Sequence, residues 1–192
     1  MSAYLRTITI LAALQCCGTA WAQHLNPKTY GAKGDGVTDD TRAINTALAA
    51  MPASGGVLEL SPGVYRFTSS IRLTKKAIVA GAGFTDDPTT ASRAAAVLLK
   101  DGDFDGISVE ADACIIRDLQ VDAKAGSGGA GIAVKAGRAV LENVAVTNQG
   151  GVGVLIGAPR TNANLWRIFN LLVLNNGSHG LSISDQIGRA HV

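Results

Sequence analysis

The chain has 192 residues, of which 47% are hydrophobic and 17% are charged, and its formal net charge is +2. A charge this small disfavours a nucleic-acid binder, which needs a strongly basic surface. The high hydrophobic content excludes disorder over most of the length and indicates a folded domain with a large core.

Residues 1–22 have the features of a secretory signal peptide. Arg6 precedes an apolar run from Ile8 to Leu14, and Ala20-Trp21-Ala22 forms a small-x-small cleavage site. The run is shorter than the roughly 18 residues that a membrane span needs, and no later segment is long enough. We therefore expect cleavage near Ala22, a secreted or periplasmic protein, and no membrane span.

The first folded segment runs from Tyr30 to Thr41 and is rich in glycine and aspartate. An α-helix is expected directly after it, because apolar residues recur there at the spacing of one helix face: Ala43, Ile44, Ala47, Leu48 and Met51. Thr38 is the expected N-cap. Asp39 and Asp40 would then lie in the first turn, where the helix dipole favours negative charge. This explanation favours a structural role for Asp35, Asp39 and Asp40 over a catalytic one.

Strand signals follow the expected helix. Gly55 to Leu60 predicts a strand, Ser61-Pro62-Gly63 a turn, and Val64 to Phe67 a second strand. Val97 to Leu99 also reads as strand.

Three aspartates, Asp101, Asp103 and Asp105, match the first half of a calcium-binding loop. Asp112 stands at the twelfth position, where glutamate is usual. The match is partial, because no helical pattern flanks it and Asp-Gly turns are common between strands. The three acids are weak candidates for a calcium site, and the sequence indicates no other cofactor.

A repeat organises the second half of the chain. Its tetrapeptides begin at Gly106, Gly131, Gly153 and Gly180. A second motif keeps step with the first, and its copies begin at Ile116, Leu141 and Ile168. Both motifs recur at intervals of roughly 25 residues, and a repeat of this length indicates a solenoid.

Apolar residues alternate within each motif, which is typical of strands with one buried face. This excludes helical repeats, and the leucine frame of a leucine-rich repeat is missing. The remaining interpretation is an all-β parallel β-helix in which Ile116, Leu141 and Ile168 stack inside. Asp118, Asn143 and Asn170 share one repeat position, which predicts a ladder at a corner with left-handed backbone. The expected helix before the first coil would cap its open end.

The N-terminal motif resembles the opening of the pectate lyase superfamily, in the subgroup shared by rhamnogalacturonase-like and epimerase-like proteins and phage tailspikes. The residues that carry the resemblance are Gly31, Gly34, Asp35, Gly36, Thr38, Asp39 and Asp40, the helix, and Gly55 to Phe67. It covers about residues 28–186 and implies a right-handed β-helix that acts on or binds polysaccharides outside the cytoplasm. It does not imply one reaction, because lyases, hydrolases, epimerases and depolymerases share this opening.

Candidate functional residues are sparse. Asn176 to Gly180 is similar to the Gly-His-Gly segment of polygalacturonases and makes His179 a weak catalytic candidate. Those enzymes need partner carboxylates, and residues 140–178 contain no acid except Glu142; the alternative is that His179 is a turn residue. Trp166 is a weak candidate for sugar binding, with packing at a turn as the alternative.

Cys114 is the cysteine that remains after signal cleavage, and we expect an inert core residue rather than a reactive thiol.

Residues 187–192 match the translation of a common sequencing-library adapter. We therefore expect residues 23–186 to be the N-terminal part of a single β-helix domain that is truncated at its C-terminus.

The sequence predicts an exported carbohydrate-active β-helix protein, the N-terminal fragment of a polysaccharide lyase or glycoside hydrolase. Its ligand would be a pectin-like or other polysaccharide. The alternative is a non-catalytic module for polysaccharide binding or adhesion, or one like a tailspike. A third possibility is a purely structural surface protein. Neither the reaction nor the oligomeric state follows from the sequence.

Overall fold

The computed structural model describes residues 23–84, 95–157 and 165–183. The expected signal peptide and the adapter-like residues 187–192 lie outside these ranges.

The described chain is all-β apart from two helices. The helices are the 3-10 helix η1 (Pro27–Tyr30) and α1 (Thr41–Ala50). The strands are β1 (Gln23–Leu25), β2 (Asp35–Asp39), β3 (Gly56–Glu59), β4 (Gly63–Phe67), β5 (Ile71–Leu73), β6 (Ala77–Ala80), β7 (Ala96–Lys100), β8 (Ile107–Val109), β9 (Ile115–Ala123), β10 (Ile132–Val134), β11 (Val140–Thr147), β12 (Val154–Ile156), β13 (Arg167–Leu174) and β14 (Leu181–Ile183).

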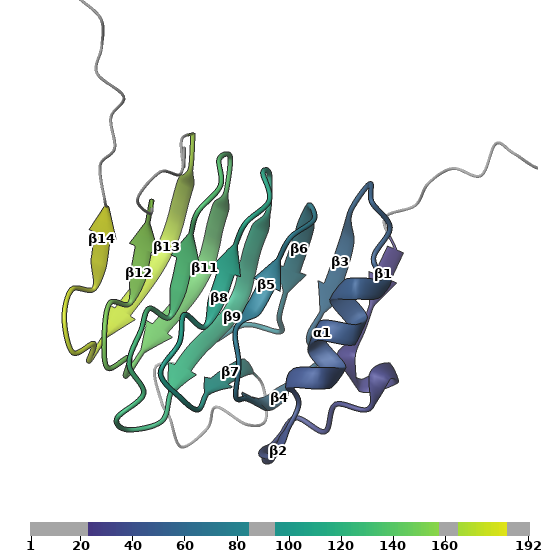
Figure 1. The fold of residues 1–192 in the computed structure, drawn as a ribbon, viewed down its shortest axis with the longest axis horizontal. Coiled ribbons are helices and arrows are strands. Elements are labelled where there is room, and N and C mark those ends of the chain that lie inside the picture. Colours follow the sequence, from purple (N-terminus) through teal and green to yellow (C-terminus); the bar gives the residue numbers. More distant parts are fainter. Residues whose placement is uncertain (1–22, 85–94, 158–164, 184–192) are drawn as a thin grey trace, which may run out of the picture.

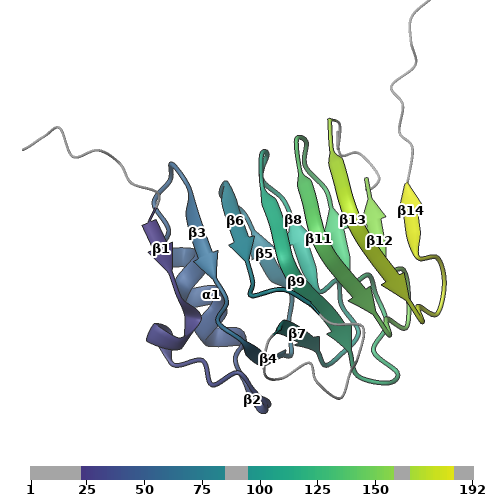
Figure 2. The ribbon, with the colours of Figure 1, turned by 180° about the vertical axis from the view of Figure 1, so that it is seen from behind.

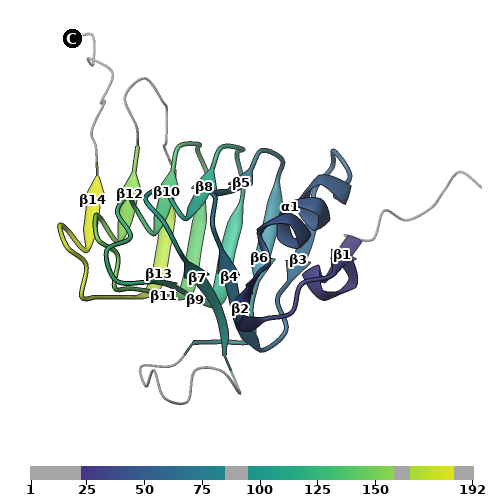
Figure 3. The ribbon, with the colours of Figure 1, turned by 60° about the horizontal axis from the view of Figure 1, so that its bottom comes forward.

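Two parallel sheets are built from strands of successive coils. One sheet follows the order β1-β3-β6-β9-β7-β4-β2, with β11 and β13 stacked beyond β9, and the other follows β14-β12-β10-β8-β5. The coils advance along one axis from β1 to β14 (Figures 1 and 2). Figure 3 shows β5, β8, β10, β12 and β14 in one row and β9, β11 and β13 in another. The all-β, parallel architecture agrees with the predicted β-helix.

The glycine-led tetrapeptides form neighbouring strands, as the repeat predicts. Ile132 of β10 pairs with Ile107 of β8 and with Val154 of β12, which in turn pairs with Leu181 of β14. The repeat does not predict one strand of this sheet: β5 pairs with β8 but has no glycine before it.

The predicted interior column is also confirmed. Leu141 pairs with both Ile116 and Ile168 across β9, β11 and β13. Ile116 and Leu141 are only 1% and 2% exposed, whereas Ile168 is partly buried against the same core.

The corner ladder forms at the predicted residues. Asp118, Asn143 and Asn170 have φ values of 56°, 53° and 48°, in the left-handed region. Asn143 Nδ2 donates to Asp118 Oδ1 at 2.8 Å, and Asn170 Nδ2 donates to Asn143 Oδ1 at 2.7 Å. The corner divides β9 between two neighbours: its residues before Asp118 pair with β6, and those after it pair with β7.

The predicted helix α1 lies at the N-terminal end of the stack (Figure 1), where it contacts η1 and β5. All five residues of its expected apolar face are buried. The predicted N-cap is wrong: the helix begins at Thr41 with Asp40 as N-cap. The predicted place of Asp39 and Asp40 in the first turn is wrong as well, because Asp39 ends β2 and the first turn contains no acid. Thr38 belongs instead to β2, where its backbone N–H and hydroxyl both bind Asp35.

None of the helices that the structure describes is both long enough and apolar enough to cross a bilayer.

Candidate functional site

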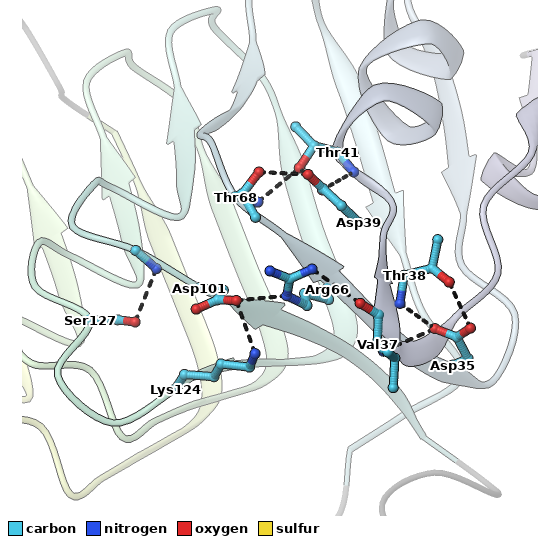
Figure 4. Close-up of polar contacts among 11 residues, drawn as sticks. Asp35, Val37, Thr38, Asp39, Thr41, Arg66, Thr68, Asp101, Lys124 and Ser127 are labelled. Carbon is cyan, nitrogen blue, oxygen red and sulfur yellow. Dashed lines mark hydrogen bonds and ion pairs between the residues drawn. The ribbon is translucent and has the colours of Figure 1, made fainter.

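Asp101, the first of the calcium candidates, lies in a network of opposite charges (Figure 4). Arg66 Nε donates to Asp101 Oδ2 at 2.6 Å, and Lys124 Nζ donates to the same oxygen at 2.9 Å. These hydrogen bonds, first that from Lys124, lower the pKa of Asp101 below its usual value. The carboxylate is held ionised and is already occupied by two cations.

The other calcium candidates connect consecutive coils. Asp103 Oδ1 accepts from the backbone N–H of Gly128. Asp105 Oδ1 accepts from the N–H of Ala130 at 3.2 Å, and its Oδ2 pairs with Lys135 at 3.1 Å. In each case the backbone donor belongs to the following coil, so these acids hold one turn against the next.

Asp112, at the twelfth loop position, follows the same rule and accepts from the N–H of Gly137 at 2.9 Å. Within the described ranges, no group of three or more His, Cys, Asp or Glu side chains is arranged to hold a metal ion. Calcium binding stays a prediction from the sequence.

The aspartates of the N-terminal motif bind backbone and hydroxyl groups near them. Asp35 accepts from the N–H groups of Val37 and Thr38, and Asp39 accepts from the N–H of Thr41 (Figure 4). Asp39 Oδ2 also accepts from the hydroxyl of Thr68 at 2.7 Å. These contacts favour the structural interpretation of the two acids.

The glycines of the same motif permit its turns. Gly31, Gly34 and Gly36 have φ values of 99°, 64° and 76°, which side chains of other residues rarely adopt. At Gly34 a Cβ would also lie 3.2 Å from the ring of Tyr65.

A second charged cluster lies on the sheet of short strands. Arg72 of β5 binds Glu110 through two bonds, Nε to Oε1 at 2.8 Å and Nη2 to Oε2 at 2.6 Å. Ser108 also donates to Glu110. The bond from Arg72 is the main reason that the pKa of Glu110 is lowered. A carboxylate held ionised in this way is a poor general acid. The ion pair of Arg72 with Glu110 was not predicted from the sequence, although Arg72 and Ser108 each stand between apolar residues of β5 and β8.

Trp166 lines a hollow at the turns before β11 and β13. Among the described residues, the hollow is lined by Arg138, Val140, Leu165, Trp166 and Arg167. Trp166 is half-buried, and part of its side chain packs against the core cluster. An aromatic ring beside two guanidinium groups is suited to bind a sugar that carries negative charge.

His179 lies in the turn before β14 and is exposed. Its Nδ1 lies 2.9 Å from Ser178 Oγ. Among the described hydrogen bonds and ion pairs of His179, none involves a carboxylate. A catalytic role for His179 therefore stays an untested prediction.

Cys114 is a free, buried cysteine, as expected. Burial is the main cause that raises the pKa of its thiol. A thiol in this environment carries little thiolate and is a poor nucleophile.

Comparison with known proteins places most of the chain in one family. A family model described as rhamnogalacturonase A/epimerase, pectate lyase-like, matches residues 24–187. Alginate lyase 7 of Azotobacter vinelandii is 46% identical over 55 residues, which are 28% of this chain and 6% of that protein. The pre-neck appendage protein of Bacillus phage phi29 is 43% identical over 56 residues, which are 29% of this chain and 6% of that protein.

A solved structure supports the fold. The catalytic unit of a thermostable GH87 α-1,3-glucanase from Streptomyces thermodiastaticus aligns with a TM-score of 0.54 at 22% identity. The alignment covers 86% of this chain and 34% of that structure. The chain therefore spans about a third of this structure, and its matches span only a small part of the curated relatives.

Proposed function

The chain belongs to the rhamnogalacturonase A/epimerase, pectate lyase-like family, and on this premise we propose that it is an exported carbohydrate-active protein. In this proposal it is the N-terminal part of a polysaccharide lyase or glycoside hydrolase that acts on pectin-like or other polysaccharides. The observation that carries the proposal is the family match over residues 24–187, across the whole described stack of coils.

The proposal includes the parts of the architecture that export and assembly require. Residues 1–22 direct export and are cleaved near Ala22. The coils wind in the right-handed sense that parallel crossovers favour, and α1 caps the first of them.

The acidic side chains favour one alternative, a non-catalytic module that binds polysaccharide. Asp101, Asp105 and Glu110 are all paired with lysine or arginine in the described coils. Glycoside hydrolysis needs one carboxyl group as acid and another as base or nucleophile. The match to a phage appendage protein is consistent with this alternative.

A polysaccharide panel separates these functions. The full chain is incubated with pectin, polygalacturonate, alginate and neutral glucans, with and without calcium. Release of reducing ends without ultraviolet absorbance indicates a hydrolase, and unsaturated products that absorb in the ultraviolet indicate a lyase. Binding without either product supports the non-catalytic module. The proposed function would be contradicted if no polysaccharide of the panel were either bound or cleaved.

A further inference from the structure

We infer that the hollow between the turns before β11 and β13 is a binding subsite for a carboxylate-bearing sugar unit of an acidic polysaccharide. This inference rests on the proposed function and specifies the ligand of one place on the surface. The recognition groups are the guanidinium groups of Arg138 and Arg167 and the indole of Trp166.

The stacking of two coils brings the two arginines together. Val140 of β11 pairs with Arg167 of β13, and the Arg167 N–H donates to the Ala139 carbonyl at 2.9 Å. Arg138 precedes β11 by two residues and has a φ of 56°. Both arginines thus line the same hollow, although they belong to successive coils and are far apart in the sequence.

Trp166 differs from the residues at its position in the preceding coils. The backbone bonds from Val140 to Cys114 and from Arg167 to Ala139 align Trp166 with Ala139 and Cys114. Cys114 and Ala139 are small and buried, whereas Trp166 is half-buried and lines the hollow. A flat apolar surface at the rim of a cationic hollow is suited to pack against a pyranose ring.

The hollow carries positive charge, and its two arginines have no ion-pair partner among the described residues. Neither Arg138 nor Arg167 forms an ion pair with another described residue, whereas Arg117 on β9 lies 3.8 Å from Asp118. Glu142 is the nearest acid along β11, two residues beyond Val140, and it forms no described ion pair with either arginine. Guanidinium groups bind carboxylates through two parallel hydrogen bonds. A neutral sugar has no carboxylate and cannot accept this pair of bonds.

The test measures binding of the full chain to polygalacturonate and to the same polymer after its carboxyl groups are reduced to alcohols. Affinity electrophoresis and calorimetric titration give the dissociation constants. We expect the acidic polymer to bind and the reduced polymer to bind at least about tenfold more weakly, the scale of one charged hydrogen bond.

Charge-matched variants locate the site. The double variant R138Q/R167Q should weaken binding by about tenfold or more. The control R42Q/R117Q removes the same charge from exposed residues outside the hollow and should leave binding within about twofold, the range of a screened surface charge. W166A should weaken binding more than W166F, which keeps an aromatic ring. Circular dichroism verifies that every variant is folded.

The outcomes distinguish the inference from the proposed function. If the acidic polymer binds equally well to R138Q/R167Q, the subsite is wrong and the proposed function stands. Equal weakening in both double variants would mean diffuse charge attraction and would also overturn the subsite. If no polysaccharide of the panel is bound or cleaved, the proposed function fails together with the subsite.

Discussion

Asp40 is the buried aspartate of the N-terminal motif, and its contacts explain why the motif needs an acid there. It is 1% exposed, Oδ1 accepts from the N–H of Lys33 at 2.7 Å, and Oδ2 accepts from the N–H of Gly34 at 2.9 Å. Its side chain therefore binds the preceding turn and makes no cap hydrogen bond to α1.

Removing the Asp40 carboxylate should destabilise the fold. We expect Asp40→Ala to lower the free energy of unfolding by about 2 kcal/mol, because two backbone donors lose their acceptor. Asp35→Ala is the matched control, and it should have the smaller effect because water can replace the exposed carboxylate of Asp35. Urea unfolding measures both. Equal effects would show that burial of Asp40 has no influence.

The raised pKa of Tyr65 predicts that the stability of the fold depends on pH in the alkaline range. Burial, followed by the charge of Asp40, raises the pKa of Tyr65 from 10.0 to about 12. Below pH 10 the phenol is neutral in the folded and unfolded states. Above it, the unfolded state ionises first, so stability is lost as the pH rises towards about 12.

The contribution of Tyr65 can be isolated by substitution. Tyr65→Phe should reduce stability at neutral pH, because the hydroxyl donates to the Ser61 carbonyl at 2.9 Å. The variant should also lose less stability than the wild type as the pH rises above 10, since phenylalanine does not ionise. Urea unfolding of both proteins at several alkaline pH values gives the difference. Parallel curves would contradict a raised pKa.

At the scale of elements, the corner ladder determines where the long strands bend. Asn143 is the central rung and bonds to Asp118 on one side and to Asn170 on the other. Its left-handed backbone costs a residue such as alanine about 1–2 kcal/mol.

Substitutions at Asn143 separate the side-chain bonds from the backbone conformation. Asn143→Ala loses both, and we expect a loss of about 2 kcal/mol in unfolding free energy. Asn143→Gly loses the bonds but permits the positive φ, so its effect should be smaller by about 1 kcal/mol. Urea unfolding provides the values. A glycine variant that is no more stable than the alanine variant would show that the backbone conformation is not the limiting factor.

The sequence predicts features that repeat or that are local. The strands after Gly106 and Gly131, the ladder at Asn143 and the apolar face of α1 all follow from periodicity. Contacts between coils that lie outside the two repeated motifs do not, because the spacing between successive repeats is uneven and leaves the register of those side chains open. The pairing of Asp101 with Arg66 and the meeting of Arg138 with Arg167 are contacts of this second kind, and they were not predicted.

At the scale of the whole molecule, the coils are buried unevenly. Ile156 of β12 is 1% exposed, whereas its register partner Ile183 of β14 is 52% exposed. Leu174 and Leu181 are exposed as well. Among the described strands, β14 pairs only with β12, so no described strand covers its other edge, beside which apolar side chains are exposed. Such an edge is a template for association with another chain or a further coil.

This edge predicts that the full chain associates with itself. We expect light scattering to show species larger than a monomer, increasing with protein concentration. L181K/I183K places two charges at the edge and should shift the population towards monomer. Val37, 76% exposed on β2 at the other end of the stack, provides the control, and Val37→Lys should leave association unchanged. A monomeric wild-type chain at all concentrations would contradict the prediction. An equal effect of V37K would mean that added charge alone prevents association, wherever it lies on the surface.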